Sequence, residues 1–113
     1  MSSTRHKQVE TARDIIKKEV EDAGLKIINI LLFGSRARGD YKEDSDWDFY
    51  VIVDKDIGFS EKREIARRIR RKLAELKIPN DIIIQSASIV ERRKDDVGYL
   101  TYYVLKEGVG VYE

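Results

Sequence analysis

A glycine–serine pair and a pair of aspartates, separated by ten residues, place the strongest constraint on the fold of this chain. Gly34-Ser35 directly follows an apolar run at residues 27–33, while Asp46 and Asp48 stand at the start of a second run at residues 49–53. Short apolar runs bounded by polar residues and glycine predict strands that are buried on both faces. Residues two apart on a strand project from the same face, so both aspartates should point together. The sequence therefore predicts two buried strands joined by a polar loop.

The glycine–serine turn has the composition of a phosphate-binding loop. Gly34 can adopt backbone conformations that other residues avoid, which permits a tight turn at the end of the first strand. Ser35 offers a hydroxyl and an N–H to a phosphate oxygen, and Arg36 and Arg38 add positive charge. We expect these four residues to hold nucleotide phosphates, with Arg36 the stronger candidate of the two arginines. The alternative is a solvated hairpin tip at residues 39–46, but such a turn needs no carboxylate within a flanking apolar strand.

Apolar spacing predicts the element order helix, strand, strand, helix, strand, helix, strand. Spacings of three and four predict a first helix over residues 4–23, ended by Gly24. Ser60 is the expected N-cap of the second helix, which Pro79 stops, and a third helix is expected within residues 96–107. The expected buried faces are Ile65, Ile69, Leu73 and Leu76 on the second helix, and Tyr99, Leu100, Tyr103 and Val104 on the third.

The three central strands are continuous apolar runs, so helices should cover both faces of the sheet that they form. This pattern predicts an α/β (α+β) fold with a small mixed β-sheet covered by helices. A length of 113 residues suffices for one core, and we expect a single domain over residues 1–113.

The charge of the chain is nearly balanced, with 22 lysines and arginines against 21 acidic residues. Such a balance lacks the overall positive field of a dedicated nucleic-acid-binding protein. The basic run at residues 67–72 leaves contact with nucleic acid or with a protein partner open, and nucleic acid is not favoured. The chain has no cysteine and no apolar N-terminal stretch, so we expect a cytoplasmic protein that is not bound to a membrane.

The segment from Gly34 to Asp40, continued by Ser45 to Asp48, resembles the minimal nucleotidyltransferases of the DNA polymerase β-like superfamily. The resemblance implies the polymerase β-like nucleotidyltransferase fold, in which the glycine–serine turn holds a triphosphate. It also implies three carboxylates on adjacent strands that bind two magnesium ions. The first two correspond to Asp46 and Asp48. The third is expected where a later strand begins after an isoleucine–proline turn, and this position is occupied by Asp81.

The expected catalytic and metal-binding residues are therefore Asp46, Asp48 and Asp81. Converging carboxylates repel one another unless cations neutralise them, so such a cluster is more often a metal site than a structural one. Magnesium prefers oxygen ligands and bridges carboxylates to substrate phosphates, whereas zinc prefers histidine and cysteine. We thus expect magnesium as the cofactor and ATP as the substrate, with the choice of ATP resting on the resemblance.

The resemblance further implies a partner. Minimal members of this family commonly pair with a small helical HEPN-domain protein in toxin–antitoxin modules, where the nucleotidyltransferase adenylylates a tyrosine of the toxin. We expect this antitoxin role, with docking surfaces at residues 36–41 and 91–96. The alternatives are transfer to RNA or to a small hydroxylated acceptor, and a non-catalytic subunit that binds nucleotide or its partner. The sequence also leaves a homo-oligomer open.

Overall fold

The computed structural model describes the backbone of residues 3–112 and the side chains of residues 7–112. In chain order the elements are α1 (Ser3–Asp22), β1 (Ile27–Phe33), α2 (Ser35–Arg38), β2 (Trp47–Val53), α3 (Phe59–Glu75), β3 (Asn80–Ser86), α4 (Ala87–Arg93), α5 (Leu100–Glu107) and β4 (Val109–Gly110). The predicted order is confirmed, and the short helices α2 and α4 are additions to it. None of the helices in this described part is long and apolar enough to cross a membrane.

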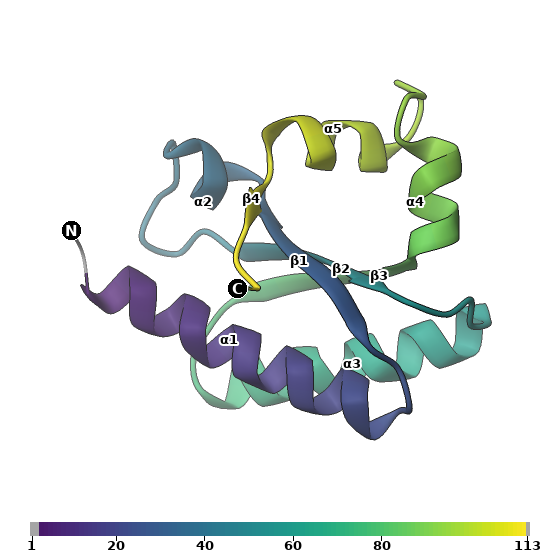
Figure 1. The fold of residues 1–113 in the computed structure, drawn as a ribbon. Coiled ribbons are helices and arrows are strands. Elements are labelled where there is room, and N and C mark those ends of the chain that lie inside the picture. The colour runs from purple at the N-terminus through teal and green to yellow at the C-terminus, as the bar shows by residue number, and fades with distance from the viewer. Residues whose placement is uncertain (1–2, 113) are drawn as a thin grey trace.

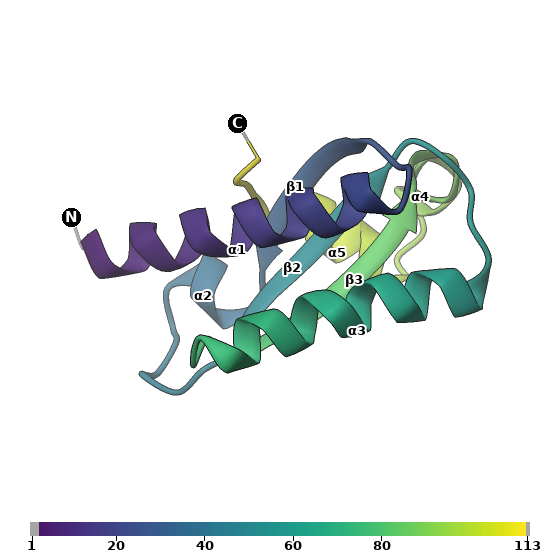
Figure 2. The ribbon, with the colours of Figure 1, turned by 90° about the horizontal axis from the view of Figure 1, so that it is seen from below.

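The strands form one mixed sheet in the order β3-β2-β1-β4. β1 pairs antiparallel with β2 and with β4, whereas β2 pairs parallel with β3. Helices α1 and α3 cover one face of this sheet, and α4 and α5 cover the other (Figure 1). Seen from below, α1 and α3 lie along the same face of the strands (Figure 2). The predicted fold class, a small mixed sheet covered by helices, is confirmed.

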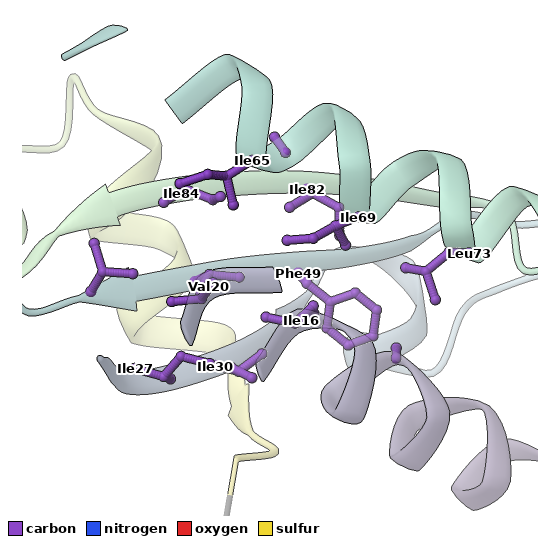
Figure 3. Packing of buried hydrophobic residues seen from close by; sticks show 14 of the residues in the cluster. Ile16, Val20, Ile27, Ile30, Phe49, Ile65, Ile69, Leu73, Ile82 and Ile84 are labelled. Carbon is purple, nitrogen blue, oxygen red and sulfur yellow. The ribbon is translucent and has the colours of Figure 1, made fainter. Parts of the chain in front are cut away.

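Burial on both faces explains why the strands are continuously apolar. The larger core cluster lies between the sheet and helices α1 and α3, where Ile16 and Ile69 pack around Phe49 of β2 (Figure 3). A smaller cluster on the opposite face joins Tyr50 of β2 to Val104 of α5. Successive residues of β2 therefore alternate between the two clusters, and neither face can be polar along the middle of the strand.

The ends of α3 differ from the prediction. The helix begins at Phe59 with Gly58 as its N-cap, so the predicted cap at Ser60 is wrong. Leu76 is 52% exposed, whereas Ile78 is only 5% exposed. The reason is a left-handed turn at Lys77 (φ 62°), which directs the N–H of Ile78 to the carbonyl of Leu73 at 3.0 Å. This is a Schellman ending that buries Ile78, the residue after the turn, in place of the C-cap residue Leu76.

Lys77→Gly should stabilise the protein by about 0.5–1 kcal/mol. A left-handed conformation costs a residue with a Cβ atom about 1–2 kcal/mol, and glycine avoids this cost. The greater freedom of glycine in the unfolded chain offsets part of the gain in stability. Urea unfolding measures the change. Lys77→Ala is the matched control, since it removes the charged side chain and keeps the strained backbone. Equal midpoints for the two variants would show that no strain is relieved at this turn.

The buried face of α5 also differs from the prediction. Tyr99, Leu100 and Tyr103 are exposed, while Thr101 and Val104 are buried. The Thr101 hydroxyl lies 2.6 Å from the buried Tyr50 hydroxyl, so the threonine faces the sheet and satisfies a polar group there. The prediction is confirmed for Val104 and wrong for the other three residues, because a threonine was not counted as a residue of the buried face.

Candidate active site

Asp48 and Asp81 are direct neighbours across two strands. The parallel register of β2 and β3 pairs Asp48 with Asp81, and Phe49 with the following residue of β3. Phe49 belongs to the cluster under α1 and α3, so by strand alternation Asp48 projects from the other face. Asp46 lies one residue before β2 and is exposed. The structure thus brings two of the three expected carboxylates together at one end of the sheet, with the third beside them in the chain.

Gly34 places the end of β1 directly against the carboxylate of Asp48. Its backbone has φ 76° and ψ −160°, a conformation that residues with a side chain rarely adopt. A Cβ atom added to Gly34 would lie 2.2 Å from Oδ2 of Asp48. Glycine is therefore required twice at this position, for the turn itself and for the close approach of backbone to carboxylate.

The carboxylates influence one another electrostatically. The pKa of Asp48 is raised above its ordinary value, mainly because the side chain is partly buried and further because Asp81 and Asp46 are negative. Arg38 acts in the opposite direction. A raised pKa means that the folded protein disfavours the ionised carboxylate, as expected where several acids converge. Negative charge is therefore concentrated at the start of β2, next to the glycine turn.

The chemistry of this acid set fits a hard divalent cation. Asp46, Asp48 and Asp81 offer only carboxylate oxygens, which are the donors that magnesium prefers. A bound cation would also relieve the repulsion that raises the pKa of Asp48. Within the described residues, however, no three acidic, histidine or cysteine side chains are gathered closely enough to hold a metal ion. Metal binding by these three residues stays a prediction.

The turn continues into α2, a single helical turn rather than an open loop. Gly34 is its N-cap and Ser35 its first residue, and the carbonyl of Gly34 accepts hydrogen bonds at 3.1 Å from the N–H groups of Ala37 and Arg38. Gly39 ends the turn with a left-handed backbone (φ 95°). Ser35 is thus held immediately after the glycine that contacts Asp48, close to where a phosphate would meet the carboxylates. Its phosphate contact stays a prediction.

Arg36 is buried rather than turned toward solvent. Its side chain is 7% exposed, and its guanidinium donates to the carbonyls of Ser45 and Glu43 at 3.0–3.2 Å. The guanidinium carbon also lies 4.5 Å from the ring centre of Tyr41 and 4.4 Å from that of Trp47. Arg36 therefore anchors the loop that leads to Asp46. This geometry does not favour the expectation that Arg36 is the nearer phosphate contact.

Arg38 is the better placed of the two arginines. Its side chain is half exposed, pairs loosely with Asp40 at 3.4 Å, and lowers the pKa of Asp48 through its charge. A half-exposed guanidinium near concentrated negative charge is accessible to a phosphate oxygen.

Comparison with known proteins decides the family. The family model described as "Polymerase beta, Nucleotidyltransferase" matches residues 10–113. The chain belongs to this nucleotidyltransferase family. A comparison with curated proteins gave no match.

Solved structures support the same fold for this nucleotidyltransferase. One is described as the crystal structure of a toxin–antitoxin with AMP-PNP, at 20% identity and a TM-score of 0.53, covering 88% of this chain and 71% of that one. Another is a mutant of the toxin–antitoxin MntA-HpeT, at 18% identity and a TM-score of 0.50, with the same two coverages. At these identities the likeness shows the fold alone.

Two aromatic residues of this nucleotidyltransferase have a role that sequence reasoning missed. Tyr41 and Trp47 flank the loop before Asp46, and both rings lie against the Arg36 guanidinium. An arginine followed within a few residues by aromatic residues is a signal of such packing. The sequence alone does not show that the loop folds back over the arginine.

Proposed function

We propose that this protein transfers AMP from magnesium-bound ATP to a hydroxyl group of a partner protein. The observation that carries the proposal is the contact between the glycine turn and the Asp48 carboxylate, with Asp81 opposite it on β3. A triphosphate held by Gly34 and Ser35 would lie directly beside the carboxylates. A site of this kind suits chemistry at phosphorus that depends on cations and positioning, as nucleotidyl transfer does.

The residues of the chain have distinct tasks in this reaction. The Ser35 hydroxyl and the Arg38 guanidinium bind phosphate oxygens, while Asp46, Asp48 and Asp81 would hold magnesium. With magnesium bound, the pKa of the acceptor hydroxyl would be lowered and the charge on the leaving pyrophosphate would be neutralised. Arg36 keeps the loop before Asp46 in place through two backbone carbonyls. The protein thereby contributes orientation more than a titrating base.

The acceptor is proposed to be a tyrosine of a small helical HEPN-type toxin. The described residues form one sheet with its covering helices, and in this proposal the partner protein orients the acceptor beside the carboxylates. Two structures with a similar fold are toxin–antitoxin proteins, and one of them carries AMP-PNP. These relatives support a protein partner and an adenine nucleotide for this chain.

Co-expression with a helical protein encoded beside it tests the proposal. The purified pair, incubated with magnesium and α-labelled ATP, should accumulate label on the partner, and mass spectrometry should place AMP on a tyrosine. GTP, CTP and UTP serve as competing donors. Label on RNA or on a small molecule, with the neighbouring protein unmodified, would contradict the protein acceptor.

A further inference from the structure

A groove of about 400 Å³ follows the outer edge of the sheet at β3. Within the described residues β3 is an edge strand, paired only with β2. Helices α3 and α4 lie on opposite faces of the sheet (Figure 1), and residues of both helices line the groove. Four consecutive residues of β3, Ile82 to Gln85, line it. The apolar part of the lining is completed by Phe59 and Ala66 of α3 and Ile89 of α4.

Among the residues that the structure describes, four cations and no carboxylate line the groove. Lys62, Arg63 and Arg70 come from α3, and Arg93 comes from α4. Three of them lie against neutral groups: Lys62 donates to the Gln85 side chain at 2.9 Å, while the arginines at 63 and 93 lie over aromatic rings. Within residues 7–112, none of the four forms an ion pair with a carboxylate.

The remaining cations of α3 show that this pattern is selective. Arg67 and Arg68 pair with Glu64, Arg71 pairs with Glu75, and Lys72 pairs with Glu19 of α1. These side chains are neutralised locally, whereas the cations at the β3 edge are not. The basic run that left a nucleic-acid contact open is thus largely occupied by ion pairs, and unneutralised positive charge remains at the groove.

The backbone of β3 favours a polypeptide over a nucleic acid as the occupant. An edge strand presents alternate N–H and C=O groups that no neighbouring strand satisfies, and an added strand pairs with both kinds. The apolar residues of the lining also suit side chains of an extended peptide. A sugar–phosphate backbone would satisfy the cations, but it has no regular row of donors for the carbonyl groups.

The groove leads to the carboxylates. Asp81 directly precedes Ile82 on β3, and the four residue steps from Gln85 to Asp81 span about 13 Å. An extended segment paired with the edge of β3 would therefore carry a residue at one of its ends to the side of Asp81 and Asp48.

We infer that the edge of β3 docks an extended acidic segment of the partner protein, which adds a strand to the sheet with its carboxylates against Lys62, Arg63, Arg70 and Arg93. The role of this segment as bearer of the acceptor tyrosine rests on the proposed function. Docking itself requires no transfer, so it is measured without ATP.

The inference is tested with a short fluorescein-labelled peptide, in which glutamate alternates with valine and one tyrosine stands near an end. Fluorescence anisotropy measures the binding of this peptide to the protein. The intact protein should bind it at least about tenfold more tightly than the same peptide with lysine in place of glutamate. R70E combined with R93E should weaken binding by at least about tenfold. R68E combined with R71E is the matched control, since it makes the same charge change on the side of α3 away from the groove, and it should alter binding by less than about twofold.

Two further measurements separate the possible occupants. A peptide N-methylated at alternate residues keeps its charge but loses strand pairing, and it should bind at least about tenfold more weakly. Oligouridine should not compete. The inference is overturned if the protein binds acidic and basic peptides equally, or if the methylated peptide binds as tightly as the unmethylated one. It is also overturned if oligouridine binds more tightly than the peptide and R70E/R93E removes that binding. Asp48→Asn should bind the peptide normally although it loses transfer. If the natural protein binds the peptide but transfers no AMP to its partner, the proposed function is contradicted and the docking site stays intact.

Discussion

Asp48→Asn should abolish nucleotidyl transfer while the protein remains folded. The substitution removes a charged oxygen ligand from the centre of the carboxylate set, and we expect the rate to fall by more than about a thousandfold. Burial and the charges of Asp81 and Asp46 raise the pKa of Asp48, so its ionised form destabilises the folded state at pH values above that raised pKa. At neutral pH without magnesium, the asparagine variant should therefore melt at the same temperature as the natural protein or at a higher one.

Transfer to the partner and thermal unfolding in EDTA measure the two effects. Asp44→Asn is the matched control: it makes the same change at an exposed position of the loop before β2, and it should leave rate and melting temperature unchanged. Asp81→Asn should behave like Asp48→Asn, because the two side chains are paired in register. Undiminished transfer by Asp48→Asn, or a markedly lower melting temperature, would remove Asp48 from the catalytic set.

Gly34→Ala should destabilise the protein by about 1–3 kcal/mol and abolish transfer. The positive φ strains any residue with a Cβ atom, and this Cβ would lie 2.2 Å from Oδ2 of Asp48. The carboxylate is the end of a side chain and can rotate away, so the fold survives at the expense of the catalytic geometry. Denaturant unfolding and transfer assays report the two losses separately.

Two variants separate the effect of backbone strain at Gly34 from the effect of steric contact with Asp48. Gly24→Ala imposes a similar positive φ of 83°, with no atom within 4 Å of the added Cβ, and should lose only about 1–2 kcal/mol without affecting transfer. In an Asp48→Ala background, Gly34→Ala should cost less than in the natural protein, because the atom it would strike is gone. Equal costs in both backgrounds would show that the glycine does not serve the carboxylate.

Local patterns were enough to predict much of the fold. The apolar run at residues 27–33 coincides with β1, and the helical spacings of α1 and α3 follow the predicted stripes. The need for glycine at position 34 was also predicted from its place between a strand and a polar loop. Leu76 shows the limit of such patterns, since a left-handed turn at Lys77 ended the helix before the stripe did. Thr101 shows another, since its burial depends on a hydroxyl contact with Tyr50 of a distant strand.

The sequence by itself determined the strands and the helices α1, α3 and α5, because backbone preference and one-sided burial are local properties. Tertiary structure alone decided which residues of different segments come into contact. Residues far apart in the chain determine the parallel register that pairs Asp48 with Asp81, and the folding-back of a loop determines the burial of Arg36. The same holds for the four cations at the β3 edge, which form no ion pair with a carboxylate among residues 7–112. Which charges pair and which side chains pack together depends on distances in the folded protein, and these distances cannot be read from composition.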